Sequence, residues 1–217
     1  MTNWSSGCMV FDVRPSSPRA ARTRAALLQA GLHLLADHTI DAIAVDQIVD
    51  RAGVAKGSFF NHFDDKHAFA TAVADAIRGD LEGKVTAANE GLADPFARLA
   101  RGMRIAAEFA LRERRRTLVM LRSADHLTGV RHPLNKGVSA DIQSVTASGS
   151  TWSGVAEWGA LYWLGLCQVL MADIAARAPE RAEAADALAA ILACGLAGLG
   201  LSPARASILA TTEILNA

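Results

Sequence analysis

The stretch AGVAKGSFFNHFDDK, residues 52–66, combines three phenylalanines with a beginning that has almost no packing volume. Lys56-Gly57-Ser58 comes first, and the aromatic side chains follow within the next five residues. A core helix would be apolar from its first turn, and a solvated helix would not carry this aromatic bulk. The stretch therefore predicts a helix that is anchored at one end and presents its N-terminal end to a partner.

The residues before this stretch predict another short helix and a tight turn. Apolar side chains recur at Val45, Ile48, Val49 and Ala52, which places them on one inward face. Gly53 stands where helices often end in a left-handed conformation that glycine adopts without a Cβ clash. Two helices joined by a glycine turn within about twenty residues form the helix-turn-helix layout, whose second helix enters the DNA major groove.

The aromatic residues explain how such a second helix would be held. Phe59 and Phe63 are four residues apart, so they share one face and can pack on the preceding helices. Residues 56–58 stay slim and polar, which suits close approach to DNA. A helix is also predicted from Arg22 to about Asp37, and Asp64-Asp65 predicts the cap of a fourth helix.

Residues 45–69, VDQIVDRAGVAKGSFFNHFDDKHAF, resemble the DNA-binding domain of the TetR (tetracycline-repressor) family of bacterial regulators. The resemblance covers roughly residues 22–70. It is carried by AGV at 52–54, GSFF at 57–60, HF at 62–63 and the lysine at 66. The resemblance implies base contacts from Lys56 and Gly57, and phosphate contacts from Ser58, Phe60, Asn61, His62 and Lys66.

The chain departs from the family pattern at several positions. Phe60 lacks the hydroxyl of the tyrosine that the family often has there. Ala44 and Val45 stand where Thr or Ser often starts the second helix, and Ala55 forgoes a cap worth about 1 kcal/mol. Asp46 is acidic where the family can place a basic or neutral DNA-reading residue. These departures concern the operator and its contacts rather than the fold.

The whole chain has a globular composition. Its 217 residues are 51% hydrophobic and 20% charged, with zero formal net charge, so any contact with nucleic acid must rest on local charge. Three scattered cysteines indicate a reduced cytoplasmic protein, without a disulfide framework or zinc site. No secretory signal is visible, and the apolar run at 158–172 is shorter than the roughly 20 residues of a membrane span.

The predicted architecture is all-α, with three parts. Residues 1–18 are expected to form a mobile arm, 19–70 the helix-turn-helix domain and 71–217 a helical domain for ligand binding and dimerisation. The arginines of the N-terminal region are either part of a soluble tail or an arm for the minor groove. These arginines are Arg14, Arg19, Arg22 and Arg24.

Long helices are predicted in the larger domain, over 96–115, 117–127, 155–177 and 182–199. The four arginines within 112–116 are interpreted either as a solvated helix end or as an anionic-ligand site. The last two helices are apolar nearly all round, which predicts a homodimer interface, and a charge at Leu192 is expected to weaken it. The residues assigned to this surface are Trp158, Tyr162, Leu166, Val169, Leu170, Leu188, Ile191, Leu192, Leu196 and Leu199.

A mainly apolar cavity for an unknown small-molecule effector is predicted inside the larger domain. Each apolar residue assigned to it could equally be plain core. The residues assigned to the cavity are Met103, Phe109, Met120, Leu121, Trp158 and Trp163, with Arg104, Asp125 and His126 as polar anchors.

These observations predict a ligand-responsive transcriptional regulator. It is expected to be a repressor that binds a palindromic operator as a dimer and is released by a small apolar molecule, with the fourth helix as the lever between the domains. The sequence contains no G-x-S-x-G nucleophile elbow, no H-E-x-x-H metalloprotease motif, no P-loop and no C-x-x-C motif. The chain is therefore not expected to be an enzyme or to hold a cofactor. The alternative is a helical ligand-binding or protein-interaction adaptor whose DNA module does not function.

Overall fold

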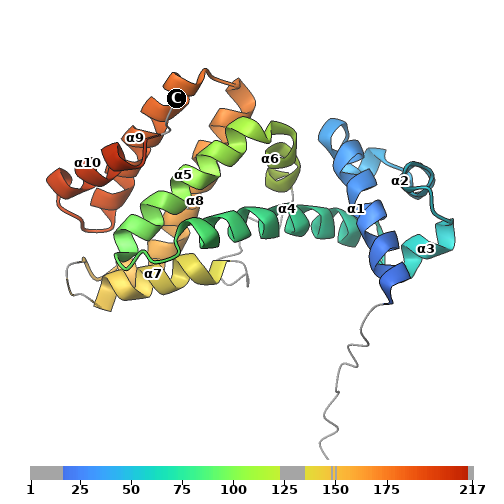
Figure 1. Ribbon diagram of the computed structural model, residues 1–217, viewed down its shortest axis with the longest axis horizontal. Helices are drawn as coiled ribbons and strands as arrows, with labels where there is room; N and C mark the ends of the chain where they lie inside the picture. Colours follow the sequence, from blue (N-terminus) through green and yellow to red (C-terminus); the bar gives the residue numbers. More distant parts are fainter. Residues whose placement is uncertain (1–16, 123–134, 148, 150, 215–217) are drawn as a thin grey trace, which may run out of the picture.

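The computed structural model describes residues 17–122, 135–147, 149 and 151–214. This part of the chain is helical and contains no strand, which confirms the all-α prediction. In Figure 1, α1–α3 form one end of the molecule, and α4 runs from them to the remaining helices. The helices are α1 (Pro18–Asp37), η1 (Ile40–Ala42), α2 (Val45–Ala52), α3 (Lys56–Phe60), α4 (Lys66–Ala88), α5 (Pro95–Arg112), α6 (Arg114–Leu121), α7 (Lys136–Ala147), α8 (Val155–Arg177), α9 (Arg181–Gly198) and α10 (Pro203–Thr212).

The first helix begins earlier than the sequence pattern predicts. Pro18 occupies its first turn, where a missing N–H costs nothing, and the Ser17 hydroxyl accepts from the Ala20 N–H at 3.2 Å. The arginines within 19–24 therefore lie on a helix and not in an N-terminal arm. The rest of the predicted arm, up to residue 16, lies outside the described residues.

A close contact between α1 and α4 holds the DNA-binding end together. A Cβ at Gly31 would lie 2.4 Å from Cζ of Phe69 and 2.8 Å from Cγ2 of Val73, so this position has no room for a side chain. Leu27 and Leu35, one turn before and after Gly31, are buried. The backbone of α1 thus packs directly on the aromatic face of α4.

The fourth helix starts at a strong cap. The Asp65 Oδ1 accepts the N–H groups of His67 and Ala68, each at 2.8 Å. The bond from Ala68, reinforced by the one from His67, holds the pKa of Asp65 below its ordinary value. The cap is confirmed, and the 23 residues of α4 span about 35 Å at 1.5 Å per residue.

The helix predicted over 96–115 is in fact two helices. α5 ends at Arg112 and α6 begins at Arg114, and Glu113 between them has φ −118° and ψ 43°, outside the helical region. The prediction of a separate helix at 117–127 is wrong at its start, because residue 117 lies inside α6. Helix periodicity continues across the break, so the sequence pattern does not show it.

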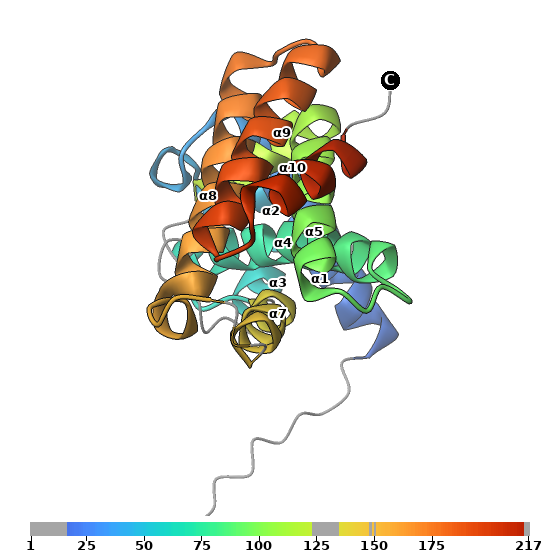
Figure 2. The ribbon, with the colours of Figure 1, turned by 90° about the vertical axis from the view of Figure 1, so that its left-hand side faces the viewer.

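The two long helices near the C-terminus agree with prediction. α8 matches the predicted bounds, and α9 is shifted by one residue at each end. In Figure 2, α8, α9 and α10 lie in front of the helix-turn-helix, which is behind them in this view. α9 packs against α5, α8 and α10, so it is covered from several sides within one protomer.

This packing corrects the predicted dimer surface. Half of the residues assigned to it are buried within the protomer, because α9 turns most of its leucines toward its own neighbours. The apolar surface that remains exposed lies mainly on α8, at Trp158, Leu161, Tyr162 and Val169. The buried residues are Leu170, Leu188, Leu192, Leu196 and Leu199.

One described helix, α8, is long and apolar enough to cross a membrane by length and composition. The helix extends beyond the apolar run at 158–172, which by itself is shorter than a membrane span. This likeness is weak evidence for a membrane span, since core helices of globular proteins have the same composition. Its contacts with α5, α6, α7 and α9 explain the apolar residues on its buried side.

Candidate functional site

The turn between α2 and α3 has the predicted helix-turn-helix geometry. Gly53 ends α2 in the left-handed region, with φ 65° and ψ 35°. Ala55 precedes α3 and gives it no side-chain cap, as its missing hydroxyl predicts. At the start of α2, the Ala44 N–H donates to the Gln47 Oε1 at 2.8 Å, which is the glutamine half of a capping box, and the half that a Thr or Ser hydroxyl would provide is missing at Ala44.

An aromatic cluster anchors the helix after the turn. Phe59 has no exposed surface, and its ring lies 5.3 Å from that of Phe69 and 5.5 Å from that of Phe63. Both predicted anchors, Phe59 and Phe63, are therefore confirmed as buried. Arg24 of α1 lies over the Phe63 ring at 5.4 Å, so a cation from the first helix also reaches this region.

Six of the seven residues assigned to DNA lie in α3 or directly after it. Ser58 and His62 are half-buried, while the rest of the set around α3 is exposed. A Cβ at Gly57 would meet no atom within 4 Å, so the fold does not require glycine there. A binding partner that approaches the backbone closely would explain the glycine at this position better than internal packing does. The exposed members are Lys56, Gly57, Phe60 and Asn61.

The predicted base reader has a carboxylate partner. The Lys56 Nζ lies 2.8 Å from the Asp46 Oδ1, and both side chains are more than half exposed. Asp46 is in the first turn of α2, so this ion pair joins the beginnings of the two helices. Because the pair is solvated, DNA phosphates and base edges can compete for the lysine.

The predicted phosphate contact at the start of α4 also has an internal partner. The Lys66 Nζ donates to the backbone carbonyl of Asp41 at 3.0 Å, which ties α4 to η1. An ammonium group has three donors, so this bond leaves others for a phosphate. Lys66 thus has a structural contact that the sequence did not indicate, since 25 residues separate the two partners.

We predict that Asp46→Asn strengthens DNA binding by roughly five- to tenfold at low salt. The substitution removes a negative charge from the DNA-facing surface and frees Lys56. Residues 19–70 contain six basic and six acidic residues, so this domain has no surplus cation to offset that carboxylate. Fluorescence anisotropy with a duplex would measure the change. Glu180→Gln, between α8 and α9, is the control, and an equal gain from it would refute a local effect.

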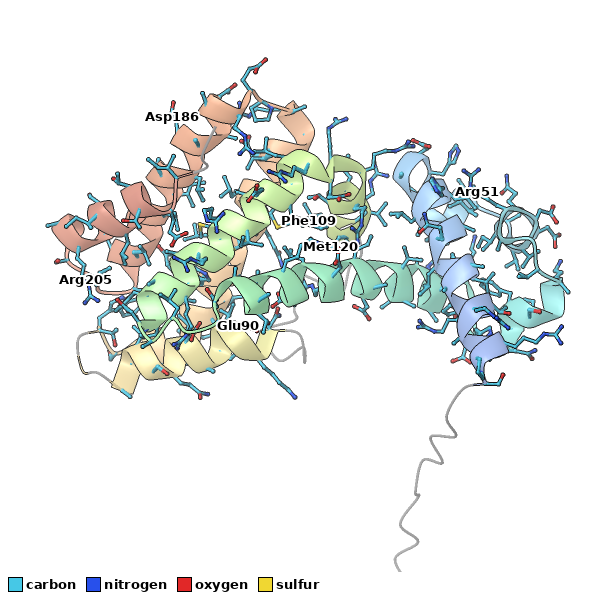
Figure 3. All side chains as sticks on the ribbon, in the orientation of Figure 1. Arg51, Glu90, Phe109, Met120, Asp186 and Arg205 are labelled. Carbon is cyan, nitrogen blue, oxygen red and sulfur yellow. The ribbon has the colours of Figure 1, made fainter. Side chains whose placement is uncertain are left out.

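A cavity of about 630 Å³ lies in the larger domain, bounded by α4, α5, α6, α7 and α8. Of the nine residues assigned to a ligand site, Met120 and Trp163 line it. In Figure 3, Met120 lies on α6 close to α4, and Glu90 lies just beyond the far end of α4. A volume of this size is typical of sites for small molecules.

The other assigned residues lie elsewhere, and their assignment to this cavity is corrected. Met103 is fully buried core, and Phe109 packs under the guanidinium of Arg116 at 5.3 Å. Trp158 is 55% exposed on the outer face of α8, because it stands five residues before Trp163 and so points elsewhere. Leu121 is partly buried outside the cavity lining.

The predicted polar anchors are likewise displaced. Arg104 pairs with Glu213 at 2.9 Å, which fastens the end of α10 to α5, and it is absent from the cavity lining. Asp125 and His126 lie outside the described residues. The charged residues that do line the cavity are Arg78, Glu82, Glu90, Arg98, Lys136 and Asp141.

Sequence reasoning missed the charged residues of α4. Arg78 is only 7% exposed, although arginine is rarely buried. Burial lowers the pKa of Arg78 and raises the pKa of Glu82 one turn later, and the mutual attraction of the two charges opposes both shifts. Two charges spaced four apart on a helix face were the available signal, but that spacing is also common on solvated helices.

The arginine-rich segment at 112–116 does not form one anion site. Its guanidinium groups point to separate partners on different helices. The Arg114 Nε donates to the Ala175 carbonyl at 2.6 Å, and Arg115 pairs with Asp37 at 2.6 Å. Arg116 pairs with Asp80 at 2.9 Å. These contacts join α6 to α8, α1 and α4, so the segment connects parts of the fold.

The described residues thus contain a helix-turn-helix with an aromatic anchor, and that segment matches a known family. Residues 27–73 match the family profile of bacterial regulatory proteins of the tetR family. Residues 27–73 are thus a tetR-family DNA-binding domain. Members of this family are DNA-binding transcription regulators and not enzymes. The resemblance seen in residues 22–70 is confirmed.

Solved structures of TetR-family regulators share the fold over most of the chain. RolR in complex with resorcinol is 19% identical, with a TM-score of 0.68, 93% of this chain covered and 99% of that one. A TetR-family transcriptional regulator from Pectobacterium atrosepticum is 22% identical, with a TM-score of 0.62 and coverages of 87% and 99%. A gamma-butyrolactone receptor (ArpA-like protein) is 17% identical, with a TM-score of 0.57 and coverages of 90% and 98%.

A comparison with curated protein sequences finds no match. At the identities of the solved structures, the likeness establishes the fold but not the ligand or the operator.

Proposed function

We propose that this TetR-family regulator is a cytoplasmic repressor that binds a palindromic operator as a homodimer and is released by a small, mainly apolar molecule. The observation that carries the proposal is that α4 belongs to both sites. Its first residue, Lys66, lies at the predicted DNA surface, and Arg78, Leu81 and Val85 of the same helix line the cavity. A ligand in the cavity therefore touches the helix that holds the recognition helix.

A second connection passes through α6. Met120 lines the cavity from this helix. The Arg122 Nη1 donates to the Leu35 carbonyl at 3.1 Å, and Arg115 pairs with Asp37. The segment of α6 is therefore bonded to the C-terminal end of α1. A ligand that moves α6 or α4 would shift the helix-turn-helix. Such a ligand acts only through a difference in its affinity for the two arrangements.

The dimer supplies the operator geometry. Two recognition helices must lie about 34–36 Å apart to enter successive major grooves. The exposed apolar stripe of α8 supports pairing of two copies through α8 and α9, because an apolar patch of this kind on a monomer would face water. Two copies also double the number of phosphates neutralised, which compensates for the zero net charge of each chain.

The ligands of the similar proteins support a small effector. RolR was solved with resorcinol, and the ArpA-like protein is a gamma-butyrolactone receptor. Both compounds are small, partly apolar molecules with oxygen atoms. The cavity described here combines apolar walls, including Leu99 and Trp163, with a few charged groups, which suits the same general kind of molecule.

The test of the DNA surface compares two lysine variants. Lys66→Ala should weaken binding about equally for the native operator and a scrambled duplex. It should also reduce the slope of log affinity against log salt concentration by about 1. Lys56→Ala should in addition relax the preference for the operator bases. Titrations at two salt concentrations measure both effects. The melting temperature of each variant is needed too, because Lys66 also bonds to Asp41. No loss of binding for either folded variant would overturn the assigned DNA surface.

The adaptor alternative has a simple test. An adaptor with a non-functional DNA module would bind no duplex even at low salt, where the phosphate contribution is largest. A regulator would bind random duplex weakly and its operator strongly. Low-salt titration of the purified full chain with both duplexes separates the two functions.

A further inference from the structure

The charges that line the cavity are not equivalent, and their arrangement indicates what kind of ligand fits. Glu90 and Lys136 are exposed, so water solvates them at the edge of the cavity. The Arg98 Nε donates to Asp141 at 2.7 Å and its Nη1 to the carbonyls of Leu92 and Ala93, so that pair is already satisfied. Of the six charged residues that line the cavity, this leaves the cation Arg78 and the carboxyl group of Glu82.

These two groups, Arg78 and Glu82, lie one turn apart on α4. Within the part of the chain that the structure describes, they form no ion pair with each other and neither side chain makes a hydrogen bond, although the charges of Glu82 and Asp75 both attract Arg78. The Arg78 guanidinium keeps its charge and lines the cavity, so water or a ligand in the cavity must accept the hydrogen bonds that the described part of the protein does not. The site therefore offers a ligand several N–H donors beside a carboxyl group.

The two neighbouring groups discriminate between ligand charges. A carboxylate ligand would pair with Arg78 but would be repelled by Glu82, and an ammonium ligand would meet the opposite problem. Arginine only donates hydrogen bonds, and an ionised glutamate only accepts them. A hydroxyl group does both, so it can accept from Arg78 and donate to Glu82 without adding a charge.

We propose that the effector is a neutral, largely apolar molecule with a hydroxyl group that bridges Arg78 and Glu82. The inference rests on the proposed function, since it names the ligand class of the same cavity. The apolar part of the molecule would lie against Leu99, Met120 and Trp163, which line the other walls. Selectivity would come from the hydroxyl, because a hydrogen-bonding site rejects analogues that leave its groups unpaired.

Four naphthalene probes test this directly at about pH 7. They are 2-naphthol, 2-methoxynaphthalene, 2-naphthoate and 2-naphthylmethylammonium, which share one apolar body and differ in the polar group. Isothermal titration of the full chain should give the tightest binding for 2-naphthol, by about tenfold over each of the others. Equal binding of the methoxy compound, tighter binding of the acid or the amine, or no binding of any probe would overturn the proposal.

Variants connect the selectivity to the two residues. In Glu82→Gln the affinity for 2-naphthoate should rise, so that the preference for 2-naphthol over the acid falls about tenfold. In Arg78→Gln both compounds should bind more weakly. Glu90→Gln removes a carboxyl from the edge of the same cavity and should leave the preference unchanged. An unaltered preference in a folded Glu82→Gln variant would remove this residue from the site.

DNA release separates this inference from the proposed function. If 2-naphthol binds with the expected selectivity but does not release the operator, the ligand class stands and the mechanism of release is wrong. If another compound releases DNA while none of the probes binds, the regulator stands and the hydroxyl inference is wrong. Isothermal titration gives the binding of each probe, and fluorescence anisotropy with operator duplex and added probe gives the release of DNA.

Discussion

Replacing Phe59 with alanine is expected to destabilise the DNA-binding domain by about 3–5 kcal/mol and to abolish operator binding. The side chain has no exposed surface and touches the rings of Phe63 and Phe69, so its removal leaves a cavity at the centre of the aromatic cluster. Because this cluster is what fixes α3 on α1 and α4, the recognition surface would lose its orientation. Chemical denaturation and duplex titration measure the two effects.

The neighbouring aromatic residue provides a matched control. Phe60 is 54% exposed, and its assigned role is contact with the DNA backbone. Phe60→Ala should destabilise the domain by only about 1 kcal/mol, because its half-exposed ring meets the cluster in one edge-on contact with Phe59 at 5.3 Å. It should still weaken DNA binding if the assigned contact is made. Equal destabilisation by both substitutions would contradict the division between an anchoring and a DNA-facing phenylalanine.

The helix-turn-helix could be predicted because its signals are local. Gly53 defines the turn within a few residues, and the spacing of Phe59 and Phe63 defines the buried face of the next helix. The cap at Asp65 was equally readable, since an N-cap acts on backbone groups two and three residues away. None of these features depends on a distant part of the chain.

The contacts of the two DNA-assigned lysines were not predictable in the same way. Lys56 pairs with Asp46 across the turn, and Lys66 bonds to a carbonyl 25 residues earlier. Such partners depend on the angle between helices, which sequence periodicity does not determine. The same holds for the arginines near residue 115, whose partners lie on α1, α4 and α8.

The residues that line the cavity could not be predicted from the sequence pattern. Of the bulky apolar residues assigned to a ligand site, Met103 is fully buried in the core and Trp158 is exposed on α8, whereas Met120 and Trp163 line the cavity. A cavity is a place where side chains fail to meet, and no residue type marks it. Its most informative residue, Arg78, belongs to a helix that was interpreted only as a lever. Buried charge, visible only after folding, identifies the site better than apolar composition does.

The second large effect concerns the proposed homodimer. Val169→Asp is expected to weaken dimerisation by at least about 100-fold and to reduce operator binding with it. Val169 is 65% exposed and lies on the face of α8 that also exposes Trp158, Leu161 and Tyr162. In an interface with two-fold symmetry each substitution places a charge on both copies, so the cost is incurred twice. Sedimentation at micromolar concentration measures the monomer fraction.

Two further variants show whether the effect belongs to this face. Ile208 on α10 is also 65% exposed, so Ile208→Asp introduces the same charge at an equally accessible apolar site and should leave the dimer intact. Leu192→Asp, by contrast, should unfold the larger domain, because Leu192 is wholly buried within the protomer. Circular dichroism would reveal that unfolding, whereas Val169→Asp should keep the native helix content. If Val169→Asp remained dimeric while Ile208→Asp became monomeric, the interface would involve α10 and the assignment to the exposed face of α8 would be wrong.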